Sequence, residues 1–162
     1  MNTKEDVPAA VQKSDNELMP FPSSFNWDPL SSLGFIMKGP SSSHTAGPNL
    51  LARQVYRLLG TQPIQISITL YNSLGDVWFG HGTVGAIIAG LLGYGPSSNV
   101  ITEANKNPKA FALSHNLDIQ WAAQHDATKH PNAIQIFASS PTKAVSLTGD
   151  SLGGGRIRYT TI

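Results

Sequence analysis

Five side chains able to exchange protons stand together between two Gly-Pro pairs in the stretch GPSSSHTAGP, residues 39–48: Ser41, Ser42, Ser43, His44 and Thr45. Hydroxyl groups can hold a carboxylate, and a neutral imidazole can accept a proton near pH 7. A helix pattern follows directly, and the unpaired N–H groups of a helix start favour a bound anion. A helix cap needs only one hydroxyl. We therefore expect an anion-receptive loop at a substrate site, with a Ser or Thr at 43–45 as the helix cap.

Two further polar stretches carry histidines. FGHGT contains His81 and Thr83, and KHPNA contains His130 and Asn132. A single histidine is more often a surface or hydrogen-bonded structural residue than a catalytic one. His44 and His81, however, each precede a threonine by one or two residues at a predicted helix start, where an orienting hydroxyl is at hand. The repeated pattern indicates a shared site, and we assign proton handling to His81.

Two other chemistries are weaker matches. A Ser-His-acid triad is possible, but the serines are not in a G-x-S-x-G turn and no carboxylate is obviously placed to orient a histidine. The stretch SLGGGRI, residues 151–157, lacks both the Lys-Ser/Thr of a P-loop and the G-x-G-x-x-G spacing. A tight bend between strands is the better interpretation of these glycines.

Composition excludes several classes of function. The 162 residues carry a formal charge of +1, and their eleven Lys and Arg are scattered, which argues against a nucleic-acid surface. The chain has no cysteine, so it can form neither a disulfide nor a thiolate metal site. Its N-terminus lacks the apolar segment of a secretory signal, and no apolar run is long enough for a membrane helix. These features predict a cytoplasmic protein, and a charged fraction of only 13% is compatible with a surface partly covered by a partner.

The elements that would position these residues follow from periodicity. An apolar stripe predicts a helix over 45–60, with Pro48 in its first turn and Gly60 at its end. Alternation of Ile64, Ile66, Ile68 and Leu70 predicts a strand within 63–75. A buried helix is predicted over 81–93, whose Gly82, Gly85 and Gly90 would permit close approach by another backbone.

The second half of the chain is rich in strand patterns. Residues 94–105 are predicted to form turns, and 107–116 a short helix capped by Asn107. Three short strands are predicted over 117–123, 133–139 and 143–149, and residues 153–162 close the chain. This order predicts an α+β domain, residues 26–162, with a mostly antiparallel sheet and packed helices. Residues 1–25 have no sustained apolar period and are predicted to be a flexible N-terminal arm.

From about Asp28 to Tyr159 the sequence resembles the β subunit or β domain of bacterial iron-sulfur-dependent L-serine dehydratases (L-serine ammonia-lyases). The resemblance rests on GPSSSHTAGP, LYNSLGDVWFGHGT, HPNAIQI and LTGDSLGGGRI, in family order and spacing. It implies conversion of L-serine to pyruvate and ammonia by a hetero-oligomer, with a [4Fe-4S] cluster held by a separate α subunit. It also implies that His81, Thr83, His130 and Asn132 face the catalytic cleft, and that residues 41–45 bind the substrate carboxylate or shape the interface.

The sequence departs from the family pattern at three points. The family usually has GHGTD, and here the acid is replaced by Val84; its YGS is here YNS, with Asn72. Two-chain β subunits often continue into a C-terminal ACT domain, which these 162 residues do not contain. The family domain is also similar to the allosteric substrate-binding domain of some D-3-phosphoglycerate dehydrogenases. A noncatalytic serine- or anion-sensing domain, favoured by Val84, is therefore an alternative, and a purely structural interaction domain is a third.

Overall fold

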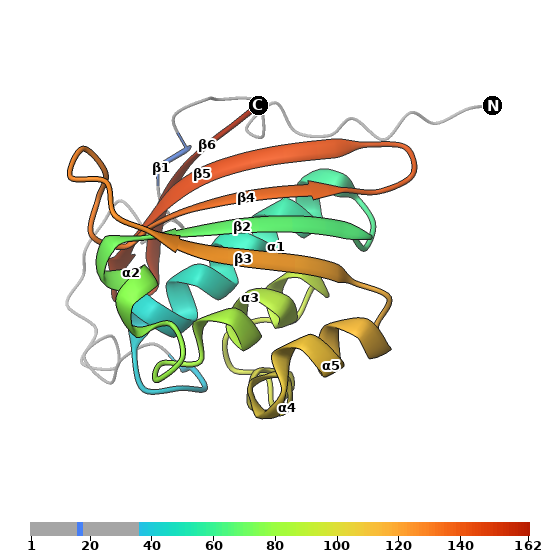
Figure 1. The fold of residues 1–162 in the computed structure, drawn as a ribbon, viewed down its shortest axis with the longest axis horizontal. Coiled ribbons are helices and arrows are strands. Elements are labelled where there is room, and N and C mark those ends of the chain that lie inside the picture. The colour runs from blue at the N-terminus through green and yellow to red at the C-terminus, as the bar shows by residue number, and fades with distance from the viewer. Residues whose placement is uncertain (1–15, 18–35) are drawn as a thin grey trace, which may run out of the picture.

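A computed structural model describes residues 16–17 and 36–162, and Figure 1 shows its fold. The helical elements are the π-helical turn η3 (Ser42–Ala46), α1 (Gly47–Leu59), α2 (Asn72–Val77), α3 (Thr83–Leu91), α4 (Val100–Lys106) and α5 (Pro108–Ser114). The strands are β1 (Asn16–Glu17), β2 (Gln65–Tyr71), β3 (Asp118–Gln124), β4 (Ala133–Ser139), β5 (Ala144–Gly153) and β6 (Arg156–Thr161).

The described strands form one sheet in the order β1-β6-β5-β4-β2-β3. All neighbours are antiparallel except β2 and β3. That pair is parallel because the chain between its strands crosses over through helices α2 to α5, whereas β4, β5 and β6 follow one another through short connections. The predicted α+β domain with a mostly antiparallel sheet is confirmed.

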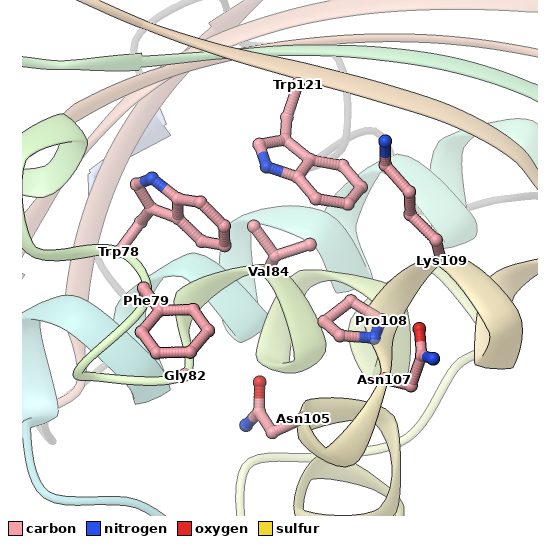
Figure 2. Close-up of a pocket in the computed structure, with 9 residues that line it drawn as sticks. All are labelled: Trp78, Phe79, Gly82, Val84, Asn105, Asn107, Pro108, Lys109 and Trp121. Atoms are coloured by element: carbon pink, nitrogen blue, oxygen red, sulfur yellow. The ribbon is translucent and has the colours of Figure 1, made fainter.

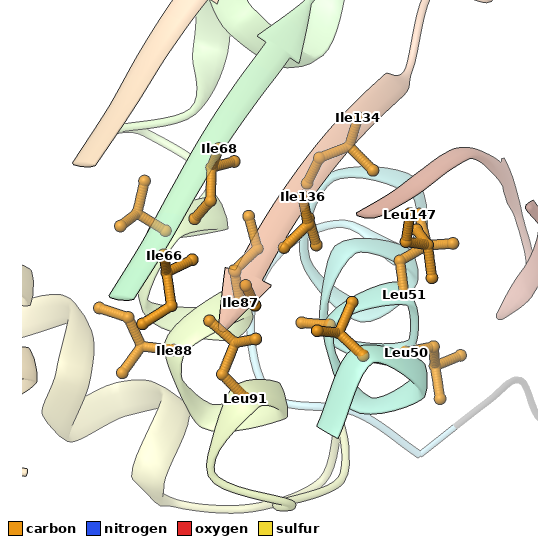
Figure 3. Close-up of a cluster of buried hydrophobic side chains, with 14 of the residues drawn as sticks. Leu50, Leu51, Ile66, Ile68, Ile87, Ile88, Leu91, Ile134, Ile136 and Leu147 are labelled. Carbon is orange, nitrogen blue, oxygen red and sulfur yellow. The ribbon is translucent and has the colours of Figure 1, made fainter. Parts of the chain in front are cut away.

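Helices α1 and α3 lie against one face of the sheet and enclose the core (Figure 3). The alternation predicted for β2 holds for Ile66, Ile68 and Leu70, which are buried. Ile64 was included in that alternation, but it precedes the strand and is 47% exposed. All nine residues of α3 are buried, as its apolar composition predicts. Each fully buried Ile or Leu side chain contributes about 1.5–3 kcal/mol, so this layer supplies most of the stability that holds the histidine loops in place.

Close packing of α3 depends on its glycines, as predicted. A Cβ at Gly90 would collide with the backbone carbonyl oxygen of Asn49 in α1 and lie 2.8 Å from Cβ of Ala52. At Gly85 it would lie 2.8 Å from the backbone nitrogen of Asn105 in α4. The absent side chains therefore let α3 pack directly on both neighbouring helices.

The expected bend at 153–155 is confirmed, because Gly153, Gly154 and Gly155 all have positive φ and join β5 to β6. The expected helix cap by Asn107 is also confirmed, since its side chain accepts from the N–H of Ala110. Two expectations are wrong. Residues 94–105 are not all turns, because α4 begins at Val100, and the cap of the first helical segment is Ser41 rather than a residue at 43–45.

The predicted flexible arm, residues 1–25, lies outside the described residues except for Asn16 and Glu17, which pair with β6. Within the described ranges, no helix is both long and apolar enough to cross a bilayer.

Candidate functional site

The polar loops singled out in the sequence meet at one end of the sheet. The turn η3 and the start of α1 lie there together with α2, which follows the end of β2, and with the bend between β5 and β6 (Figure 1). The backbone N–H of Gly154 in that bend donates to Oγ of Ser42 at 3.1 Å. The predicted loop is thus joined to residues more than a hundred positions away.

His44 lies within a network of serine hydroxyls. Its Nδ1 is 2.9 Å from Oγ of Ser43 and 3.1 Å from Oγ of Ser41, and its Nε2 is 3.3 Å from Oγ of Ser73. Its backbone N–H donates to Oγ of Ser41, which closes the helix cap. Both ring nitrogens therefore have hydroxyl partners, which hold the ring in one orientation.

Ser73 was not predicted as a site residue. It stands in LYNSLG, a motif that carries the resemblance, within the segment 63–75 that was predicted to contain a strand. Its contact with His44 joins residues 29 positions apart, and a local pattern cannot show such a contact.

His81 stacks beside His44, with ring centroids 5.0 Å apart and ring planes tilted by 32°. Nδ1 of His81 is 3.3 Å from the carbonyl oxygen of Val77. Because a carbonyl can only accept, this hydrogen bond requires the proton on Nδ1 and leaves Nε2 of the neutral ring as a base. Nε2 has no hydrogen-bond partner among the described residues. The nitrogen best able to take a proton is thus the one left open.

Burial lowers the pKa of His44 below 6.5, and the neighbouring charge of a protonated His81 lowers it further. The physical cause is that a half-buried imidazolium loses hydration, and two cationic rings in contact repel each other. His44 is therefore held neutral at pH 7. A neutral ring can exchange donor and acceptor roles with the serine hydroxyls around it.

Thr45 and Thr83 hold the two histidine segments together. The hydroxyl of Thr45 donates to the carbonyl oxygen of His81 at 2.8 Å, and that of Thr83 donates to the carbonyl oxygen of His44 at 2.7 Å. Both threonines are completely buried. Each histidine is thus followed by a threonine that binds the backbone of the other histidine, and we call this reciprocal pair of bonds the threonine clasp. The orienting hydroxyls were expected from the sequence, whereas the bond from each threonine to the opposite histidine segment was not.

His130 and Asn132 lie near this end of the sheet but are bonded to other groups. Nδ1 of His130 accepts from the N–H of Asn132 at 3.0 Å, and the Asn132 side chain donates to the carbonyl oxygen of Ser151 at 3.4 Å. Within the described residues, no hydrogen bond or ring contact joins either of them to the histidine pair. The structure therefore brings His44 and His81 into contact and leaves His130 and Asn132 as a separate group.

Asn72 replaces the glycine expected from the resemblance and takes up a left-handed conformation, with φ of 51°. Asparagine is the non-glycine residue best suited to that conformation. Its side chain also makes a two-way bond with the backbone of Asp126, accepting and donating at 2.9 Å. The departure thus keeps the turn before Ser73 and adds an anchor for the following loop.

The donor groups do not fit a thiolate-held iron-sulfur cluster. The chain contains no cysteine, and the described residues contain no group of three or more His, Cys, Asp or Glu that could hold a metal ion. Any cluster at this site would need its ligands from outside these 162 residues.

The site of this α+β domain thus combines a histidine held by serine hydroxyls with a second histidine that keeps one ring nitrogen without a partner among the described residues. The family model described as Serine dehydratase beta chain matches residues 32–161. The chain belongs to this family.

Curated relatives agree with the family assignment. The chain is 36% identical to the probable L-serine dehydratase beta chain of Bacillus subtilis over 130 residues, covering 80% of this chain and 57% of that protein. It is 31% identical to the L-serine dehydratase beta chain of Peptoniphilus asaccharolyticus over 131 residues, covering 80% and 58%. It is 32% identical over 138 residues to an L-serine dehydratase of Streptomyces coelicolor, covering 72% and 30%. The chain thus spans less than two thirds of the length of each of these relatives.

Proposed function

We propose that this chain supplies the β part of an L-serine dehydratase, which converts L-serine to pyruvate and ammonia. The family match and the names of the relatives support this activity. The observation that carries the proposal is the histidine pair, in which His81 keeps an open Nε2 while its Nδ1 is bonded to a carbonyl.

The roles of the residues follow from chemistry. Dehydration of serine requires a base for the α proton and loss of the β-hydroxyl. His81 takes the proton on Nε2, because a neutral imidazole is a competent base near pH 7. The serine hydroxyls of residues 41–43 hold the substrate carboxylate, and His44, itself neutral, keeps the hydroxyls of Ser41 and Ser43 in place.

The proposal includes a partner. An α chain would hold a [4Fe-4S] cluster by its own cysteines, since the residues described above do not fit one. When bound, such a cluster supplies a Lewis acid for the substrate hydroxyl. The complex would be a hetero-oligomer in the cytoplasm, and this chain would be inactive alone.

A serine-sensing domain without turnover is the second candidate, and its basis in the sequence is Val84. In the structure Val84 is 1% exposed and belongs to the hydrophobic core. No hydrogen bond of the histidine pair involves its side chain. The absence of an acid at this position therefore leaves the histidine network complete, which favours the catalytic role.

The test uses the chain together with a cognate α chain whose cluster has been reconstituted anaerobically, and measures pyruvate release from L-serine. We expect turnover only with both chains, and a loss of about 10²-fold or more in kcat for His81→Gln, which is typical for loss of a general base. His115→Gln is the matched control, because Nδ1 of His115 also lies near the carbonyl oxygen four residues earlier, Phe111, but in α5.

Two results would contradict the proposal. One is full turnover by His81→Gln in the assembled enzyme. The other is an assembled complex that binds serine by isothermal titration but releases no pyruvate, which would favour the sensor.

A further inference from the structure

A separate cavity of about 270 Å³ lies beside the helix that carries Thr83 (Figure 2). Its walls come from the end of α2, the start of α3, the segment joining α4 to α5, and β3. Gly82 and Val84, the neighbours of Thr83, both line it, whereas His44, His81 and Thr83 do not. The cavity is therefore distinct from the histidine site, although the same backbone segment borders both.

Three aromatic rings line the cavity, those of Trp78, Phe79 and Trp121. Trp78 and Trp121 meet edge to face with centroids 5.8 Å apart, and Phe79 meets Trp78 in the same way at 5.7 Å. Phe79 is 81% exposed, which is unusual for so large an apolar side chain. The two tryptophans face the open space in Figure 2, with Val84 between them at the floor. Such walls suit a flat or branched apolar group.

The polar groups at this cavity are donors. The ammonium of Lys109 lies 5.7 Å from the ring centroid of Trp121 and has no acidic partner among the described residues. The indole N–H groups of Trp78 and Trp121 have no acceptor within the same part of the chain. The side-chain oxygens of Asn105 and Asn107 already accept from backbone N–H groups. No Asp or Glu lines the cavity.

We propose that this cavity binds a small carboxylate with an aromatic or branched apolar body, in which the rings hold the apolar part and Lys109 pairs with the carboxylate. This ligand is not L-serine, whose side chain is too polar for such walls. The inference goes beyond the proposed function and does not depend on it. The cavity borders the segment that carries His81 and Thr83, since Gly82 and Val84 line it. A bound ligand would therefore contact the backbone that positions His81.

The test is isothermal titration of the full 162-residue chain with 3-phenylpropionate, compared with its neutral analogue 3-phenylpropanamide. We expect saturable binding of the acid in the millimolar range or tighter, and weaker binding of the amide. Lys109→Gln should weaken binding of the acid about fivefold, which corresponds to about 1 kcal/mol for one partly exposed ion pair. Lys109 is exposed, so its removal does not endanger folding.

The matched control is Lys129→Gln, since Lys129 also lies over an aromatic ring, 4.8 Å from the centroid of Tyr71, but does not line the cavity. Its binding should equal that of the unaltered chain. The inference is overturned by equal affinity for acid and amide, or by equal effects of the two lysine substitutions. It is also overturned if the chain shows no saturable binding of the acid.

Discussion

Removing the threonine clasp should loosen the histidine pair without altering either imidazole. Thr45→Val and Thr83→Val keep the shape of the side chain and delete only the hydroxyl that donates to the opposite histidine carbonyl. Each substitution leaves a carbonyl oxygen in a part-buried bond without this donor. Such a loss costs about 1–3 kcal/mol of the free energy of unfolding, so two such losses would add to about 2–6 kcal/mol in the double variant.

The two bonds run in parallel between the same two segments, which makes their effects interdependent. With one bond gone, the other still joins the segments. With both gone, the backbones of His44 and His81 are free to separate from their 5.0 Å ring contact. We therefore expect a coupling energy of at least about 0.5 kcal/mol between the two substitutions in urea unfolding.

Turnover is the second readout. If the two threonines only stabilised the fold, kcat of the folded variants would not change. In the assembled enzyme, each single variant should keep most of its turnover, and the double variant should lose kcat more than it raises KM, measured where it is fully folded. Thr69→Val in β2 is the control, because Thr69 is half-buried and makes no side-chain hydrogen bond in the described part of the chain. Strictly additive stability losses with unchanged kcat would refute the clasp as a device that positions the histidines.

Two further predictions concern pH and packing. Because the pKa of folded His44 lies below its ordinary value of 6.5, the unfolded chain binds more protons near that pH, so the free energy of unfolding should fall as pH drops below 6.5; His44→Gln should flatten this slope in denaturant titrations at several pH values, and an unchanged slope would contradict the assignment. Gly90→Ala should destabilise the fold by about 1–3 kcal/mol in thermal or urea unfolding, because its Cβ would collide with a carbonyl of α1. Gly60→Ala is the control, because a Cβ there has nothing within 4 Å. It should be destabilised only by the strain of placing alanine in a left-handed backbone conformation.

The sequence predicts best those features that depend on local period or backbone freedom. The strand β2 follows from its alternation, the helix α3 from its continuous apolar run, and the bend at 153–155 from three successive glycines. The helix α4 was missed because it has only seven residues, and just Ile101 and Ala104 of them are buried. Such a segment carries too short an apolar stripe to show a helical period.

For the candidate site, too, the residue types could be predicted from the sequence, but their contacts could not. The residue types around His44 and His81 predicted their joint importance, since each histidine stands before a threonine at a helix start. Which groups they contact depends on how distant segments meet. The bond from Ser73 to His44 spans 29 positions, and the bonds of the clasp span 36 and 39. These contacts are properties of the tertiary fold, and no local spacing encodes them.

The abundance of hydroxyls between the two Gly-Pro pairs is explained by the separate tasks that the fold gives them. Ser41 accepts the N–H that begins the helix, and Ser42 accepts the N–H of Gly154. Accepting this bond leaves the hydroxyl proton of Ser42 available to donate, whereas Ser41 also shares hydrogen bonds with Oγ of Ser43 and Nδ1 of His44. The proton of Thr45, in contrast, is already donated to a carbonyl, and its side chain is fully buried. A carboxylate at this loop would therefore be held by the serine hydroxyls, and the contribution of Thr45 to binding would be through the position of the histidines.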